Sequence, residues 1–347
     1  MKFAVGYRFS DTGELFCEML ADYRTSVGEV YFAWPGTPSG RPDPGGDPEL
    51  IEQLVYELSE IKRLGIALDL LLNANCYGGG AVSAELERKT VGIIAALGEN
   101  GVMPQIVTTT SPFVAATVKK HFPDMELRAS VNMRIDSTLA MDYLADKFDS
   151  FYIRRDLQRD LATLRNFHDW CRAHGKKLGM LANSGCLRNC PYQTFHDNLV
   201  AHDAAVRNCE NVRDFLPHLC WERYRKSENA SDFLRGSWLR PEDIVTYAPY
   251  VDIVKLATRQ HASPRLVIAA YTSGSFDGNV FDLTEPCFSG AFAPYILDNT
   301  KLAAGDLPGL CATNCRHCGK CEKALEKALH PLPRCTDNGG DVGTNLE

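Results

Sequence analysis

Short apolar, β-branched runs alternate with helical patterns along most of the chain. Eight of these runs have the length and composition of strands. They span residues 2–9, 29–34, 66–75, 105–110, 127–133, 150–155, 177–184 and 251–259. Apolar positions at three- and four-residue spacing predict helices between them. These helices are expected at Pro48 to Leu64, 84–97, 113–121, 137–145 and 157–174.

Eight strands that alternate with helices predict an α/β fold, a (β/α)8 TIM-type barrel. An open doubly wound sheet is the alternative, but no G-x-G-x-x-G fingerprint opens the first helix. We expect the barrel to occupy residues 1–285, with an insertion at about 191–247 after the seventh strand. A Cys-rich extension is expected at 286–335 and a disordered tail at 336–347.

Polar residues gather where the predicted strands end, which in a barrel is the rim that carries the functional site. They are Arg8, Trp34, Asn73, Asn75, Cys76, Thr108, Thr109, Asn132, Arg134, Arg154, Arg155, Asn183, Cys186 and Arg259. Polarity returns at the end of any strand, so Thr108 and Thr109 carry little weight. Arginines that follow several different strands favour an anionic ligand. The predicted substrate-binding residues are Arg134, Arg154, Arg259, Asn132 and Asn183.

Composition narrows the classes of function. The chain has 347 residues, 45% of them apolar, and a net charge of −7. A negative net charge disfavours nucleic acid as a partner, because phosphate binding depends on Lys and Arg. No apolar stretch is long enough to cross a bilayer, and the first residues do not resemble a signal peptide. We therefore expect a soluble, cytoplasmic protein that binds no membrane.

The 13 cysteines are many for a cytoplasmic protein, in which disulfides seldom persist, so their spacing indicates metal ligation. The densest run is CATNCRHCGKC, whose cysteines are Cys311, Cys315, Cys318 and Cys321. Its C-x2-C-x2-C core is typical of a [4Fe-4S] cluster, with zinc as the alternative. Glu322, not proline, follows the last cysteine, so Cys287 or Cys335 could be the fourth ligand instead.

A second set of cysteines is expected at the barrel mouth. NSGCLRNCP places two of them just after the seventh strand, and LNANCYGGG places another after the third. A further cysteine, Cys220, belongs to the insertion. A single cysteine is often a small buried hydrophobic residue, but a C-x3-C pair followed by proline favours ligation. The predicted ligands of this second cluster are Cys76, Cys186, Cys190 and Cys220.

The segments NSGCLRNCPYQTFHDNL, YIRRDL and SWLRPEDIVTYAPYVDIVKLATR resemble the peptidase U32 family. The resemblance extends from about the third strand to the eighth. The family was first described as collagenase-like peptidases. Its better-studied members are oxygen-independent hydroxylases with a [4Fe-4S] cluster on four cysteines, and several are linked to prephenate. They act on ubiquinone precursors, ribosomal RNA or transfer RNA.

Carried over by position, the resemblance implies that Cys186 and Cys190 bind the cluster, with Cys220 as the third ligand. Arg155 and Asp156 match the family's Arg–acid pair, here with Asp instead of the usual Glu. His196 follows the C-x3-C pair, in a segment where the family often has a histidine. The predicted catalytic residues are therefore His196, Arg155 and Asp156. The chain lacks a basic appended domain, which disfavours RNA as substrate, and it adds the tail cluster.

These observations predict an iron–sulfur oxidoreductase with two [4Fe-4S] clusters that acts on a small anionic metabolite. Hydroxylation, hydroxyl transfer or reductive dehydroxylation without O2 would suit such a site. An electron donor such as a ferredoxin or flavodoxin is expected as partner, with the tail cluster as relay. The inner cluster could have three or four thiolate ligands. Alternatives are a non-catalytic electron-transfer subunit, a zinc-stabilised barrel enzyme and an RNA-modifying hydroxylase. Peptidase activity is disfavoured, because no free nucleophilic cysteine beside an oriented histidine is apparent.

Overall fold

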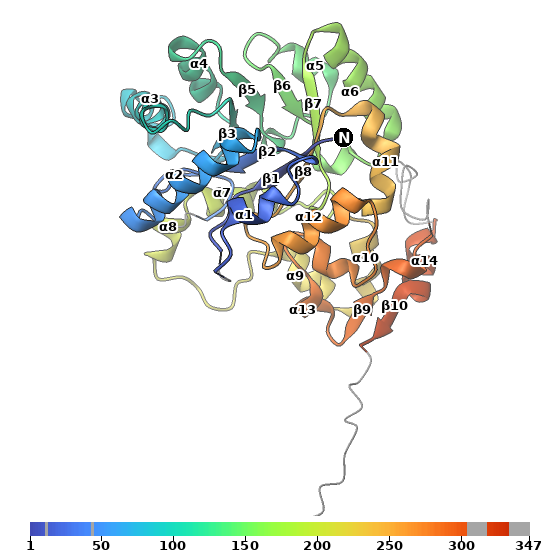
Figure 1. Ribbon diagram of the computed structural model, residues 1–347. Helices are drawn as coiled ribbons and strands as arrows, with labels where there is room; N and C mark the ends of the chain where they lie inside the picture. The colour runs from blue at the N-terminus through green and yellow to red at the C-terminus, as the bar shows by residue number, and fades with distance from the viewer. Residues whose placement is uncertain (11–12, 43–44, 304–317, 333–347) are drawn as a thin grey trace, which may run out of the picture.

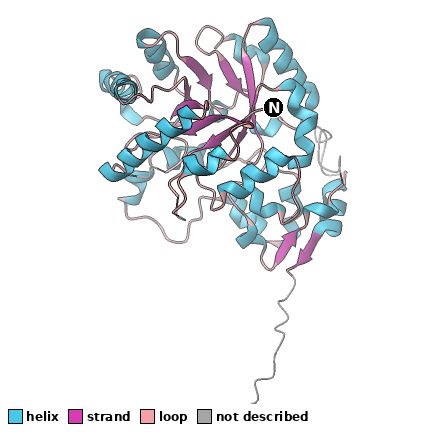
Figure 2. Cartoon of the chain, viewed as in Figure 1, coloured by secondary structure: helices cyan, strands magenta, loops and turns pink. Residues whose placement is uncertain are grey.

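Eight parallel strands form a closed barrel in chain order, as the sequence pattern predicts. The computed structural model describes residues 1–10, 13–42, 45–303 and 318–332. The strands are β1 (Phe3–Gly6), β2 (Val27–Phe32), β3 (Ala67–Leu72), β4 (Ile106–Thr109), β5 (Glu126–Ala129), β6 (Ser150–Tyr152), β7 (Lys177–Leu181) and β8 (Ile253–Leu256). Closure is made by β1 and β8, whose register pairs Phe3 with Val254. The predicted (β/α)8 barrel is confirmed (Figures 1 and 2).

Helices surround the barrel on the outside (Figure 2). They are α1 (Phe16–Ala21), α2 (Pro48–Arg63), α3 (Ala84–Glu99), α4 (Pro112–His121), α5 (Thr138–Asp142), α6 (Leu161–Ala173) and α12 (Pro264–Ser273), with the 3-10 turns η1 (Gly78–Gly80), η2 (Val131–Met133) and η3 (Arg155–Leu157). The helix predicted at 157–174 begins later, because the Asp160 carboxylate accepts from the amides of Ala162 and Thr163 and caps a new helix.

Charged residues fill part of the barrel interior. The buried Arg128 guanidinium donates to Glu29 at 2.9 Å and to Glu126 at 2.8 Å. Nearby, the Lys255 ammonium lies 3.7 Å from the centre of the Tyr31 ring. Burial raises the pKa of Asp69, which accepts a hydrogen bond from Thr108, and lowers the pKa of Lys255. Thr108 therefore belongs to the barrel interior rather than to its rim.

The chain between β7 and β8 forms the predicted insertion. It contains α7 (Gln193–Ala201), α8 (Asp203–Arg207), α9 (Leu219–Tyr224), η4 (Ser227–Asn229), α10 (Ser231–Leu234), η5 (Pro241–Asp243), α11 (Ile244–Tyr247) and η6 (Ala248–Tyr250). After α12 follow η7 (Val280–Leu283), α13 (Ser289–Phe292), β9 (Tyr295–Leu297), η8 (Asn299–Lys301), α14 (Lys320–Ala328) and β10 (Leu329–Pro331). The strands β9 and β10 pair as a small antiparallel sheet away from the barrel (Figure 2).

The insertion and the C-terminal segment share a second hydrophobic core. Phe233 of α10 contacts Phe281, Phe288 and Phe292 at ring-centre distances of 4.8 to 6.3 Å. The buried Arg240 guanidinium donates to the side chain of Asn299 and to backbone carbonyls that follow it. The described part of the extension, residues 286–303 and 318–332, therefore packs on the insertion (Figure 1). None of the described helices is long and apolar enough to cross a membrane.

Candidate functional site

A cavity of about 500 Å³ lies between the carboxyl end of the barrel and the insertion. Residues of η3, the loop after β7, α7, α9 and the segment 285–287 line it. Four cysteines are among them: Cys186, Cys190, Cys220 and Cys287. Three of the four belong to the predicted mouth cluster, and the fourth comes from a different part of the chain than we expected.

A short backbone pairing brings Cys186 and Cys287 into the same cavity. Ser184 and Glu285 form a parallel bridge, and the Gly185 amide donates to the Glu285 carbonyl at 3.1 Å. The two cysteines each follow this bridge by two residues. A side chain at Gly185 would meet the Phe288 ring at 2.6 Å and the carbonyl of residue 286 at 3.0 Å. Glycine is therefore required for the two segments to approach this closely.

The four thiols are partly buried, and one of them lies beside the guanidinium of Arg155. The Arg155 guanidinium is 7% exposed and donates to Sγ of Cys186 at 3.2 Å. It also donates to the side-chain oxygen of Asn132 at 3.2 Å. When the side-chain amide of Gln193 is oriented with its oxygen toward Arg155, that oxygen accepts a hydrogen bond from the guanidinium at 3.0 Å. Arg155 therefore holds a polar wall of the cavity together. Asn132 supports this arginine and is not among the residues that line the cavity.

Burial raises the pKa of two of the thiols. The pKa of Cys220 rises to about 12, because burial and then the neighbouring Cys186 disfavour its thiolate. Burial is also the main cause of the raised pKa of Cys190. Without a metal these groups are protonated at neutral pH, whereas a bound metal cation would reverse that balance.

Two histidines face each other at the cavity wall. The rings of His196 in α7 and His218 are edge to face, 4.6 Å apart at their centres. Burial, and next the neighbouring His218, lowers the pKa of His196 to about 4. The His196 ring is therefore neutral at pH 7 and can accept one proton. The structure places this predicted catalytic residue in the cavity.

The predicted substrate-binding residue Arg134 holds α7 across the barrel mouth instead. Its guanidinium donates to the carboxylate of Asp197 at 2.7 Å, and Asn75 donates to the same carboxylate at 3.3 Å. Arg134 itself has a left-handed backbone, with φ of 56°. The helix that carries His196 is therefore bound to loops that follow β3 and β5.

Asp156, predicted to be catalytic, is buried and supports the loop that carries the C-x3-C pair. It accepts from the Asn189 amide at 2.9 Å and from Arg154 at 3.0 Å. Arg154 also lies 3.5 Å from Asp136, so it is held in ion pairs. Asn183, predicted to bind substrate, is fully buried and donates to two backbone carbonyls. Asp156, Arg154 and Asn183 are not among the residues that line the cavity.

Sequence reasoning missed Arg41 and Glu285, which line the cavity together. The Arg41 guanidinium donates to Oε1 of Glu285 at 2.9 and 2.7 Å. Burial favours a raised pKa at Glu285, but the charge and hydrogen bonds of Arg41, together with the backbone amide of Gln260 and the charge of Arg259, hold that pKa below its usual value. Neither residue follows a predicted strand, so no sequence pattern pointed to them. Arg259, the last predicted substrate-binding arginine, lines a neighbouring cavity.

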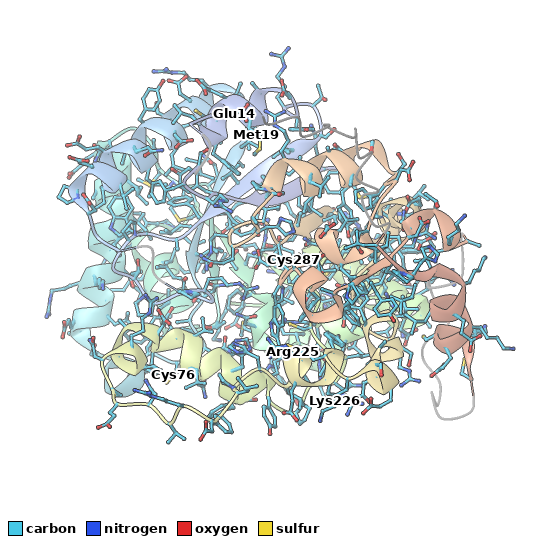
Figure 3. The ribbon with its side chains drawn as sticks, turned by 90° about the horizontal axis from the view of Figure 1, so that it is seen from below. Glu14, Met19, Cys76, Arg225, Lys226 and Cys287 are labelled. Carbon is cyan, nitrogen blue, oxygen red and sulfur yellow. The ribbon has the colours of Figure 1, made fainter. Side chains whose placement is uncertain are left out.

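Cys76 is not among the residues that line the cysteine cavity. Its sulfur accepts from the Gly78 amide at 3.3 Å. In Figure 3, Cys76 lies toward one edge of the view, whereas Cys287 lies near the centre. The structure therefore offers Cys287 rather than Cys76 as the fourth cysteine of the cavity.

The tail cluster is described only in part. Cys318 is exposed, and Cys321 in α14 packs against the second core. Cys311 and Cys315 lie outside the described residues. Within the described ranges, no three Cys, His, Asp or Glu side chains lie close enough together to hold a single metal ion. The predicted ligation of both clusters therefore stays a prediction.

No family model matches the chain. The sequence is 27% identical over 284 residues to a protein of Methanocaldococcus jannaschii described as "Uncharacterized protease MJ1657", and the match covers 80% of this chain and 82% of that protein. A shorter stretch of 75 residues is 39% identical to an N-acetyl-gamma-glutamyl-phosphate reductase of Pelobacter propionicus. This match covers 21% of this chain and 20% of that protein. Among solved structures, that of the U32 peptidase Mk0906 aligns with a TM-score of 0.53 and 13% identity, covering 75% of this chain and 94% of that one.

Proposed function

We propose that this chain, whose likeness to the peptidase U32 family is confirmed by these comparisons, is an iron–sulfur oxidoreductase that acts on a small anionic metabolite without O2. The single observation that carries the proposal is the convergence of four cysteines on one cavity beside Arg155 and His196. Hydroxylation, hydroxyl transfer and reductive dehydroxylation remain the reactions to distinguish.

The residues of the cavity suit an iron–sulfur cluster. Four thiolates are the usual ligand set of [4Fe-4S], and Cys186, Cys190, Cys220 and Cys287 would hold it. When bound, the cluster would supply electron transfer and, if one iron lacked a thiolate, a Lewis acid. A single zinc ion needs ligands that meet at about 2.0–2.3 Å from one point. No three Cys, His, Asp or Glu side chains of the described residues form such a group, so the metal content of the purified protein must distinguish zinc from an iron–sulfur cluster.

The remaining groups would bind the substrate and move protons. Arg155 brings positive charge to the cavity wall, which suits a carboxylate, whereas the charge of Arg41 is balanced by Glu285. The neutral ring of His196 can accept a proton from a hydroxyl group or return it. Helix α7, bound through Asp197 to Arg134, lines one side of the cavity and would limit the entry of water there. Asp156 and Arg154 position the cysteine loop rather than act on the substrate.

A second [4Fe-4S] cluster on Cys311, Cys315, Cys318 and Cys321 remains part of the proposal, as an electron relay from a ferredoxin or flavodoxin. Its support is that Cys321 packs against the same hydrophobic core as Cys190 and Cys220. A relay through that core would keep the path between the two centres inside the protein.

The test is anaerobic purification, iron and sulfide analysis, and EPR after reduction. Two clusters correspond to about eight irons per chain. Cys190→Ala and Cys318→Ala should each remove one EPR signal and leave the other. About four irons per chain would mean that only one of the two sets of cysteines binds a cluster. A preparation that holds zinc in place of iron would refute the proposal.

Two other functions compete with this one. The name of the archaeal relative suggests peptidase activity. However, burial raises the pKa of Cys190 and Cys220, so neither is an activated nucleophile without a metal. A non-catalytic electron carrier needs no substrate cavity, and the volume of about 500 Å³ favours an enzyme. Hydrolysis of labelled gelatin that is lost in Cys190→Ala would support the peptidase instead.

A further inference from the structure

A second cavity, of about 240 Å³, opens at the carboxyl ends of β8, β1 and β2. Its lining residues are Tyr7, Arg8, Phe9, Ala33, Pro42, Leu54, Arg259 and Gln260. Pro42 and Gln260 also line the cysteine cavity, so they form a shared wall. This wall is anchored, because the Gln260 amide donates to Oε2 of Glu285 at 3.2 Å and Arg41 donates to Oε1. The two cavities are therefore neighbours with a fixed boundary.

The floor of the small cavity is apolar and rigid. The rings of Tyr7 and Phe9 are edge to face with centres 5.2 Å apart, and Leu54 of α2 is 1% exposed. The Tyr7 hydroxyl donates to the buried carboxylate of Glu57 at 2.9 Å. That carboxylate also accepts from the Cys17 amide and from Gln53. The Tyr7 ring is thus fixed, and burial raises the pKa of its hydroxyl, which stays protonated.

Two guanidinium groups line this otherwise apolar space. Arg8 donates to the carbonyl of Phe9 at 3.2 Å and to the carbonyl of His261. Arg259 donates from Nη2 to the Ser39 hydroxyl at 3.1 Å. Each guanidinium is oriented by these bonds and carries five N–H donors in a planar fork that matches a carboxylate.

We propose that this small cavity is a second ligand site, which binds a small monocarboxylate with a compact apolar body. The carboxylate would face Arg8 and Arg259, and the apolar body would lie on the rings of Tyr7 and Phe9. An offset or edge-to-face contact with those rings favours an aromatic body of about the size of benzoate. The site uses none of the four cysteines, so it does not depend on the proposed redox chemistry.

Calorimetric titration of the full chain, as purified anaerobically, tests this site with three probes: benzoate, benzyl alcohol and inorganic phosphate. Benzoate should bind, and the other two should bind at least tenfold more weakly, because one lacks the charge and the other lacks the apolar body. Ala33→Leu, which fills the cavity, should abolish benzoate binding. Arg259→Gln should weaken benzoate at least tenfold and leave benzyl alcohol unchanged.

Val200→Phe is the matched control, because it fills the cysteine cavity instead. It should leave benzoate binding unchanged. Loss of binding in Val200→Phe but not in Ala33→Leu would place the ligand in the cysteine cavity and overturn the proposal. Equal binding of all three probes, or no binding of benzoate to the unmodified chain, would also overturn it. Iron content, measured on the same preparations, reports on the proposed function separately.

Discussion

The guanidinium of Arg155 donates to the sulfur of Cys186 at 3.2 Å, inside a cavity that three further cysteines line. A cation beside a thiolate ligand stabilises the added electron when a metal centre is reduced. We therefore expect Arg155→Gln to lower the reduction potential of the inner cluster, measured by EPR during redox titration. Arg172→Gln is the control, since Arg172 lies in α6 and pairs with Asp252 instead. An equal shift in both variants would contradict a specific role for Arg155.

Cys287 and Cys76 should differ in their effect on iron content. Cys287 lines the cavity with Cys186, whereas Cys76 is not among the residues that line it. We expect Cys287→Ala to lower the iron bound by the inner site and to alter its EPR spectrum, and Cys76→Ala to leave both unchanged. The opposite result would restore Cys76 as the fourth ligand.

The second core should contribute strongly to stability. Phe233 is fully buried among Phe281, Phe288 and Trp238. Phe233→Ala should lower the free energy of unfolding by about 3–5 kcal/mol, because it removes apolar contacts and leaves a cavity. Val245, 73% exposed in α11, is the control, and its change to Ala should cost less than about 0.5 kcal/mol. Urea unfolding followed by circular dichroism measures both.

The depressed pKa of His196, about 4 in the folded chain, makes stability depend on pH. Unfolded histidine titrates near its ordinary pKa of about 6.5. At a pH between these two pKa values, His196 is protonated in the unfolded chain and neutral in the folded chain. Stability is therefore lost as pH falls from about 6.5 toward 4. His196→Gln, which cannot bind this proton, should lose less stability than the unmodified chain between pH 7 and pH 4.5. Equal losses in urea titrations would argue against a buried, neutral His196.

Helix α7 should loosen when its attachment is removed. Asp197 accepts from Arg134 and Asn75 across the barrel mouth. Asp197→Ala should accelerate hydrogen exchange at the amides of α7, because the helix loses its polar contacts with two barrel loops. Asp146→Ala, which breaks an exposed pair with Lys147, should leave those amides unchanged. Unchanged exchange in Asp197→Ala would show that packing alone holds α7.

The sequence by itself determined the architecture and part of the site. The spacing of apolar residues is a local property, and it predicted all eight barrel strands and the insertion. Arg155 and Cys186 were expected at the mouth because each follows a predicted strand, and the structure shows them in contact there. A local pattern suffices for these features because the carboxyl ends of parallel barrel strands must all meet at one rim.

Only the tertiary structure decided which other side chains meet there. Cys287 lines the same cavity as Cys186 because of the bridge between Ser184 and Glu285, residues far apart in the sequence. The course of the loop backbones, not the periodicity of the strands, decides which distant side chains come together, so no local residue pattern predicts such contacts. For the same reason Asp156 and Arg154 follow a strand yet pair with loop groups beside the cavity. Burial and charge pairing, which depend on the whole fold, thus separated the residues that line the cavity from those that position it.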